Sequence, residues 1–195
     1  MSAVPSSSTV RLRAARGVDV PTLVALDEQL FGEAAWGEAS WWAELARRPR
    51  RYYVVAERAG QDAVAAVSAR QDIVGYAGCD LGGSSADVMT VATHPQVRGQ
   101  GVGDLLVGRL AHVAASAGAS ALLLEVRADN APAMRLYARH DFEEIARRPR
   151  YYQPDDVDAV VMRKLLDAHD VATSPAGAPG TAPGPGDGHR GGETR

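Results

Sequence analysis

The sequence predicts a layered α+β domain, with helices on both faces of a mixed, mostly antiparallel sheet. The apolar pattern predicts this class. Short apolar, β-branched runs are interleaved with longer segments whose apolar residues recur every three or four positions, as in a helix. The chain has 195 residues, of which 46% are hydrophobic and 23% charged. These values are typical of a globular protein and allow one domain with its own core.

The first half of the chain is predicted to hold four strands and two helices. Residues 10–15 alternate apolar and polar side chains, the pattern of a half-buried strand. Asp19 is the expected N-cap of the first helix, which has Pro21 in its first turn and runs to Phe31. A polar, mobile loop is expected between the second and third strands. The remaining elements are a helix over 36–47 and strands over 52–58, 73–79 and 88–93.

The second half is predicted to hold two helices and three strands. The apolar residues of 102–117 fall at helical spacing, so this helix should bury one stripe. A buried strand over 121–126 and a short helix over 131–140 follow. The closing strands are expected over 142–146 and 157–164.

The two ends of the chain differ from the rest in composition. Residues 1–9 are Ser-rich and predict a flexible lead. The last 23 residues contain seven Gly, four Pro and no aromatic residue, so they cannot bury enough apolar surface to offset chain entropy. We therefore expect a folded domain over 10–166 and a disordered tail over 167–195.

Charge and composition exclude several classes of protein. A net charge of −3 argues against a general nucleic-acid binder. No apolar run approaches the length of a membrane span, and residues 1–9 lack the features of a signal peptide. The single cysteine, Cys79, rules out an internal disulfide framework and fits a reducing compartment. We expect a soluble cytoplasmic protein that binds neither nucleic acid nor membranes, and no spacing of metal ligands is present.

The most informative motif is the glycine-rich run 98–103, Arg-Gly-Gln-Gly-Val-Gly, between a predicted strand and a predicted helix. Such a turn leaves backbone N–H groups unpaired at the helix N-terminus, where they can bind a phosphate or another anion. The Lys and Ser/Thr of a Walker A loop are missing, and Asp104 stands where a dinucleotide fingerprint needs its third glycine. The run is either another kind of phosphate loop or a plain strand-to-helix turn.

A second motif begins at Glu125, which interrupts the apolar strand over 121–126. Burying a carboxylate is costly unless it is paired, hydrated or used in chemistry. Glu125 either serves a reaction or pairs with Arg127, its same-face neighbour. Asn130, Ala133 and Tyr137 share one face of the next helix, which would point at the same cleft. Taken alone, Asn130 is an ordinary N-cap and Tyr137 an ordinary core residue.

The two motifs, Arg-x-x-Gly-x-Gly and then Leu-Glu-Val-Arg-x-x-Asn-x-x-Ala-x-x-x-Tyr, together resemble those of the GCN5-related N-acetyltransferase family. The resemblance covers roughly residues 10–165 and is closest to bacterial members that acetylate the N-terminal alanine of a small-subunit ribosomal protein. Two features depart from the family. Asp141 stands before Phe142 where the family usually has glycine, and the loop over 32–37 is longer than expected. The further matches are the aromatic loop over 31–42, the pair Tyr151 and Tyr152 after Arg147 and Arg148, and the closing strand over 157–162.

The resemblance implies a sheet that splays between its fourth and fifth strands, with acetyl-CoA bound in the opening and no metal. It also implies direct acetyl transfer to the N-terminal amine of a protein, with Glu125 as general base and Tyr137 as general acid. The residues implied for acetyl-CoA are Val91, Ala92, Thr93, Arg98, Gly99, Gln100, Gly101, Val102, Gly103, Asp104 and Asn130. The residues implied for the peptide are Trp36, Tyr151 and Tyr152. Packing at the sheet edge is the alternative for each of them and is favoured for Trp36.

Two other functions are compatible with these motifs. One is an N-acetyltransferase that acts on a small-molecule amine. The other is a non-catalytic regulator that binds an acyl-CoA, an interpretation that the presence of both Glu125 and Tyr137 disfavours.

Overall fold

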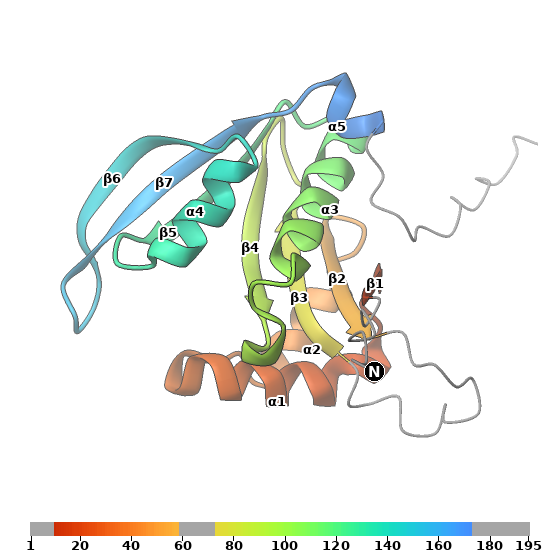
Figure 1. Ribbon diagram of the computed structural model, residues 1–195. Coiled ribbons are helices and arrows are strands. Elements are labelled where there is room, and N and C mark those ends of the chain that lie inside the picture. Colours follow the sequence, from red (N-terminus) through yellow and green to blue (C-terminus); the bar gives the residue numbers. More distant parts are fainter. Residues whose placement is uncertain (1–9, 59–72, 173–195) are drawn as a thin grey trace, which may run out of the picture.

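Figure 1 shows the computed structural model, which describes residues 10–58 and 73–172. These residues form a seven-stranded sheet in the order β1-β2-β3-β4-β5-β7-β6, antiparallel except for the β4–β5 pair. The predicted fold class is confirmed. The strands are β1 (Val10–Ala14), β2 (Arg51–Arg58), β3 (Ile73–Asp80), β4 (Ala86–Thr93), β5 (Ala121–Arg127), β6 (Glu143–Tyr152) and β7 (Val157–Leu165). The helices are α1 (Val20–Phe31), α2 (Glu38–Ala46), α3 (Val102–Ser116), α4 (Ala131–Arg139) and α5 (Ala168–Ala172).

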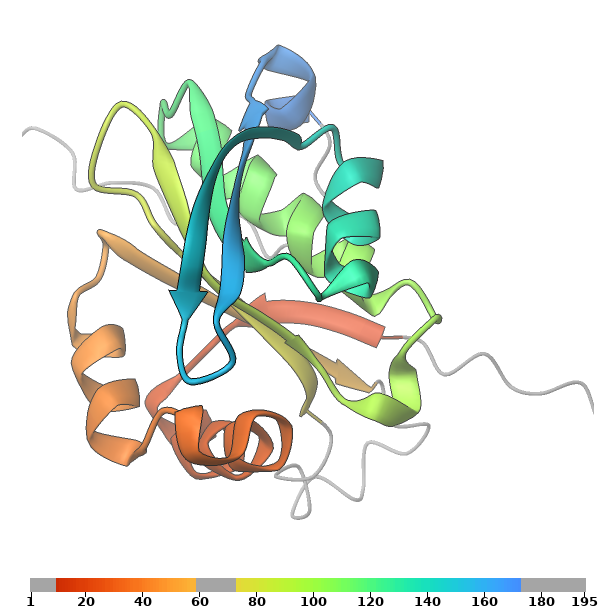
Figure 2. The same cartoon turned by 90° about the vertical axis from the view of Figure 1, so that its left-hand side faces the viewer.

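The two faces of the sheet are covered by different helices, α1 and α2 on one face and α3 and α4 on the other (Figure 2). The alternation of side chains along β2 shows why. Val54 and Ala56 are buried against α3, whereas Tyr53 and Val55 are buried against α1 and α2. Each face therefore has its own core.

The parallel pair β4–β5 is held by only two residue pairs, Ala86 with Leu122 and Asp87 with Leu123. Beyond them β4 continues beside β3 alone, while β5 pairs along its whole length with β7. The β5, β7 and β6 strands therefore bend away from the rest of the sheet and leave a V-shaped opening (Figure 1). This confirms the splay implied between the fourth and fifth strands.

Strand β6 is longer than the sequence predicts. The apolar pattern predicts a strand over 142–146, but the ladder with β7 continues through two irregular points to Tyr152. The polar run that follows Ala146 includes Pro149, which argues against a central strand. The strand tolerates it because β6 is the last strand of the sheet, with one edge unpaired.

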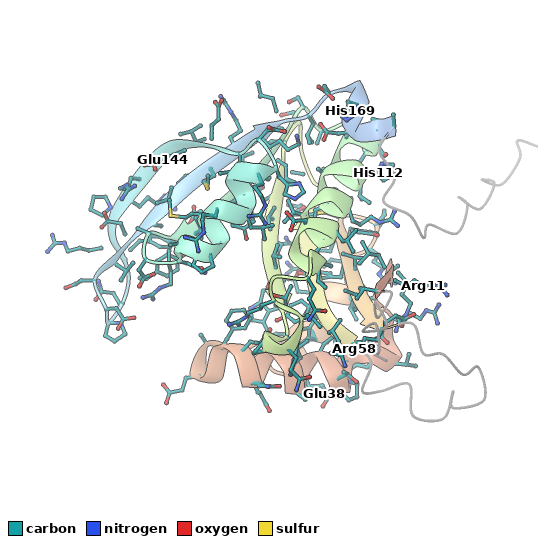
Figure 3. The ribbon with its side chains drawn as sticks, viewed as in Figure 1. Arg11, Glu38, Arg58, His112, Glu144 and His169 are labelled. Carbon is teal, nitrogen blue, oxygen red and sulfur yellow. The ribbon has the colours of Figure 1, made fainter. Side chains whose placement is uncertain are left out.

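The predicted disordered tail begins at residue 167, but its first residues form the helix α5. The Asp167 carboxylate accepts hydrogen bonds from the backbone N–H groups of His169 (2.8 Å) and Asp170 (3.3 Å). The short helix contacts α3, since His112 Nδ1 lies 3.1 Å from the carbonyl oxygen of Asp170 (Figure 3). Lys164 of β7 also pairs with the Asp170 carboxylate at 3.3 Å.

The other predicted terminal and loop features, the flexible lead 1–9, the loop between 58 and 73 and the tail from 173 on, lie outside the described residues. Within the described residues, no helix has the length and apolar character needed to cross a membrane.

The packing of α3 on the sheet predicts the effect of truncating adjacent leucines. Leu106 is fully buried, whereas Leu105 is 37% exposed. Leu106→Ala should lower the free energy of unfolding by about 2–5 kcal/mol because it leaves a cavity. The matched variant Leu105→Ala should change it by at most about 0.5 kcal/mol. Urea denaturation of both variants measures the difference, and equal losses would contradict this description of the core.

Candidate active site

A cleft of about 610 Å³ lies where β4 and β5 diverge. Segments far apart in the sequence form its walls: the end of α1, the last residues of β4, the glycine-rich loop with the start of α3, and α4. This volume is within the usual range for pockets that bind small molecules.

The glycine-rich loop forms one end of the cleft. Gly99 and Gly101 have φ angles of +75° and +80°, which residues other than glycine rarely adopt. Gly101 is the N-cap of α3, and the first helical bond runs from the Leu105 N–H to its carbonyl oxygen, at 3.1 Å. The N–H groups of residues 102–104 therefore precede the hydrogen bonds of the helix and are placed to bind an anion.

Ten of the eleven residues implied for acetyl-CoA line this cleft. Gln100 does not, because its side-chain amide donates to the carbonyl oxygen of Gln96 at 2.8 Å and its N–H to that of Val97 at 3.2 Å. The lining residues are Val91, Ala92, Thr93, Arg98, Gly99, Gly101, Val102, Gly103, Asp104 and Asn130.

Asn130 is the N-cap of α4, and its Oδ1 accepts a hydrogen bond from the Ala133 N–H at 3.2 Å. Capping and binding are compatible here, because Asn130 also lines the cleft. The cap uses the carbonyl oxygen of the side chain, while the amide N–H groups lie on its other side.

Tyr137 lines the cleft from α4 and is 8% exposed. Its ring packs on Phe142, with 5.7 Å between ring centroids. Burial, followed by the proximity of Tyr152, raises the pKa of its hydroxyl to about 12. The phenol therefore stays protonated at neutral pH and can donate a hydrogen bond or a proton into the cleft.

Glu125 lies on the opposite face of β5 from α3 and α4, because its neighbours Leu124 and Val126 are buried against those helices. The expected ion pair of Glu125 with Arg127 is wrong. The side chain is 32% exposed, and it pairs with Arg148 of β6, whose Nη1 lies 2.9 Å from Oε1.

Arg127 has different partners from the one expected. Its guanidinium pairs with Asp129 at 2.9 Å and with Asp155 at 3.0 Å. Arg148 of β6 reaches Glu125 because β5 and β6 both pair with β7, which brings their exposed side chains to the same face of the sheet.

Tyr152 interacts electrostatically with residues on both faces of the opening. Burial, followed by Glu125, raises the pKa of its hydroxyl, and Tyr152 in turn contributes to the raised pKa of Tyr137. It therefore lies within electrostatic reach of both residues. Tyr152 packs edge to face on Tyr151 at 5.3 Å, and the Arg127 guanidinium lies 5.4 Å from its ring centroid. Neither tyrosine lines the 610 Å³ cleft.

Trp36 packs into the core beneath α1 and α2 and does not line the cleft. Its ring centroid lies 5.3 Å from that of Trp41 and 6.3 Å from that of Tyr53, and its backbone N–H donates to the Asp27 carboxylate at 2.6 Å. This placement matches the packing alternative for Trp36.

Two residues of the site are not predicted from the sequence. Phe31 lines the cleft and is 45% exposed, and it is recognisable in the sequence as a large apolar residue directly before a glycine. Asp87 belongs to the last β4–β5 pair, and its pKa is raised by burial first, then by Asp80, with a smaller effect of Glu125. Asp87 is therefore a second carboxylate near Glu125 at the apex of the opening.

Comparison with known proteins identifies this fold as that of an N-acetyltransferase. Residues 22–142 match the acetyltransferase (GNAT) family, so the chain belongs to that family. Within it, the chain is similar to N-alpha-acetyltransferase RimI of Mycobacterium tuberculosis, with 32% identity over 160 residues that cover 80% of this chain and 92% of RimI. The resemblance seen in the sequence is thereby confirmed.

Two further proteins are similar to this chain. An uncharacterised protein of Mycobacterium leprae is 38% identical over 151 residues, which cover 75% of this chain but only 38% of that relative. The crystal structure of the ribosomal-protein-S18-alanine N-acetyltransferase from Escherichia coli matches with a TM-score of 0.68 at 23% identity, covering 81% of this chain and 94% of that one. The second match shows the shared fold.

The backbone of the glycine-rich loop generates a prediction. Gly101 and Gly37 are both N-cap residues with open space where a Cβ would stand, but Gly101 has φ +80° and Gly37 has φ −72°. Gly101→Ala should therefore be less stable than Gly37→Ala by about 1 kcal/mol, the cost of a left-handed conformation for an L-residue. Thermal unfolding measures both variants, and equal stabilities would refute the strained turn.

Proposed function

We propose that this protein transfers the acetyl group of acetyl-CoA to the N-terminal amine of a protein, with the N-terminal alanine of a small-subunit ribosomal protein as substrate. The observation that carries the proposal is the opening between β4 and β5. The N–H groups of residues 102–104 and Tyr137 line it on the side of α3 and α4, and Glu125 lies on the opposite face of β5. The similarity to RimI supports the same reaction.

The residues of the cleft fit the parts of acetyl-CoA. The N–H groups of residues 102–104 suit the diphosphate, with Arg98 at the entrance of the loop. The edge of β4 over residues 91–93 pairs with β3 on one side only, so its other main-chain groups suit the amides of the pantetheine arm. Asn130 is placed to donate to the same arm.

Bound acetyl-CoA would supply an acetyl group on a thioester carbon, and the chain's residues would move the protons. A peptide α-amine has a pKa of about 7.7–8.0, so much of it is protonated at neutral pH and must lose a proton before attack. Glu125 would accept that proton, through a water molecule, on the exposed face of β5. Glu125 would then release it to solvent.

Tyr137 would assist departure of the sulfur. Because burial keeps its phenol protonated, Tyr137 can donate to the sulfur as negative charge develops there. The sulfur ends as a thiol, and the second proton that the nitrogen loses as the amide forms restores the phenol of Tyr137. One proton per turnover therefore leaves to solvent.

The roles of Glu125 and Tyr137 can be separated from binding. Glu125→Gln and Tyr137→Phe should each lower kcat by about 100-fold or more, the usual contribution of a general acid or base. The Kd of acetyl-CoA should stay near the wild-type value, as measured by calorimetry.

The control is Glu144→Gln, which removes an exposed carboxylate that pairs with Arg147 of the same strand at 3.1 Å (Figure 3). This variant should retain wild-type turnover. A Glu125→Gln enzyme with unchanged kcat would remove Glu125 from the role of base and direct attention to Asp87.

The acceptor is tested by competition between substrates. The enzyme should acetylate peptides that begin with alanine faster than polyamines or amino sugars, because Tyr151 and Tyr152 offer a surface for an extended peptide beside Glu125. An array of N-terminal peptides and free amines, read by mass spectrometry, gives the ranking. Faster reaction of a free amine would indicate a small-molecule acetyltransferase, and binding of acetyl-CoA without any product would indicate a regulator.

Mass spectrometry can also test the substrate in the cell. Loss of the gene should leave one ribosomal protein with a free N-terminal alanine, detected by intact-mass analysis of purified cytoplasmic ribosomes. An unchanged set of ribosomal protein masses would exclude a ribosomal substrate.

A further inference from the structure

Two oppositely charged side chains meet at the phosphate end of the cleft. Asp104 lies in the first turn of α3, and Arg139 is the last residue of α4. Arg139 Nε lies 3.2 Å and Nη2 3.0 Å from Asp104 Oδ1, and Nη2 lies 3.1 Å from Oδ2. Both residues line the cleft.

An aspartate at this position is unexpected for a site that binds an anion. The N-terminus of a helix favours negative charge on a ligand, and a carboxylate beside it repels that ligand. Here the carboxylate is matched by two basic side chains, since His140 Nε2 also lies 3.2 Å from Oδ1. Asp104 therefore gathers side chains of α4 at the mouth of the cleft.

The Arg139 guanidinium retains donors for a ligand. It has five N–H groups in a planar fork. Nε and Nη2 face Asp104, and one N–H of Nη1 donates to the carbonyl oxygen of Arg135 at 3.3 Å, so that the second N–H of Nη1 can donate to a ligand. The side chain is 58% exposed, so it can adjust to a ligand without disturbing the core.

We propose that Arg139 binds a phosphate group of the coenzyme and that Asp104 is the positioning residue that holds its guanidinium over the N-terminus of α3. The inference rests on the proposed use of acetyl-CoA. It gives the phosphate site two parts, the main-chain N–H groups of residues 102–104 from α3 and a planar guanidinium from α4. Guanidinium and phosphate form strong charge-assisted hydrogen bonds, often two at once.

The competing explanation is that Arg139 only neutralises Asp104. Exposed ion pairs of this kind contribute little to stability, so the pair would then be a surface contact without a role in binding. The two explanations predict different effects of Arg139 on coenzyme binding when Asp104 is replaced by an uncharged residue.

A double-mutant cycle separates them. The Kd of acetyl-CoA is measured for wild type, Arg139→Gln, Asp104→Asn and the double variant. Arg139→Gln should weaken binding about tenfold in the wild-type background, the loss expected for a charge-assisted hydrogen bond, and by a smaller factor of about three in the Asp104→Asn background, where the guanidinium is no longer held in place. Acetyl-pantetheine, which has no phosphate, should bind equally to wild type and Arg139→Gln.

The matched control is Arg135→Gln, one turn earlier on α4 and outside the cleft lining, which should leave the Kd unchanged. If Arg139→Gln has no effect in the Asp104→Asn background, or weakens acetyl-pantetheine to the same degree, the proposal is overturned. Failure of wild type itself to bind acetyl-CoA would instead overturn the proposed function.

Discussion

The early end of pairing between β4 and β5 is the constraint on which the site depends. After two residue pairs, each strand keeps a partner on only one side, β3 for β4 and β7 for β5. The backbone N–H and C=O groups along the two facing edges then need hydrogen-bond partners from outside the sheet. Helices α3 and α4 pack closely above it, since a Cβ on Gly103 would lie 3.0 Å from Leu136. The result is a cleft with a polar floor of backbone and walls of helix.

The opening also connects the two faces of the sheet. The glycine-rich loop, Asn130 and Tyr137 belong to the face covered by α3 and α4. Glu125 belongs to the other face, where Arg148 and Tyr152 from β6 surround it. Two reactants that approach from opposite faces would therefore meet between β4 and β5, with Tyr152 within electrostatic reach of the groups on both sides.

Local sequence patterns predict the parts of the site that depend on the backbone. The glycine-rich turn requires positive φ at Gly99 and Gly101, and the spacing of Asn130 and Tyr137 places both on the cleft face of α4. Side-chain partners are different, because they depend on which strands become neighbours.

The partner of Glu125 illustrates the limit of sequence reasoning. Arg127 is its nearest same-face cation in the sequence, but Arg148 is brought to it by the β5-β7-β6 order. In the same way, the contact of Asp104 with Arg139 exists only because α4 packs across the start of α3. Sequence patterns underestimate the extent of β6 because this strand is mostly polar and contains Pro149, features that an outermost strand accommodates.

That outermost strand has a consequence for the behaviour of the molecule at high concentration. Nine of the ten residues of β6 are exposed, and an open strand edge of this length is a template for joining the sheet of a second copy. Pro149 lacks the N–H that such joining would need, and charged side chains on an outermost strand further disfavour it. These features of β6 therefore disfavour pairing between the outer strands of two copies.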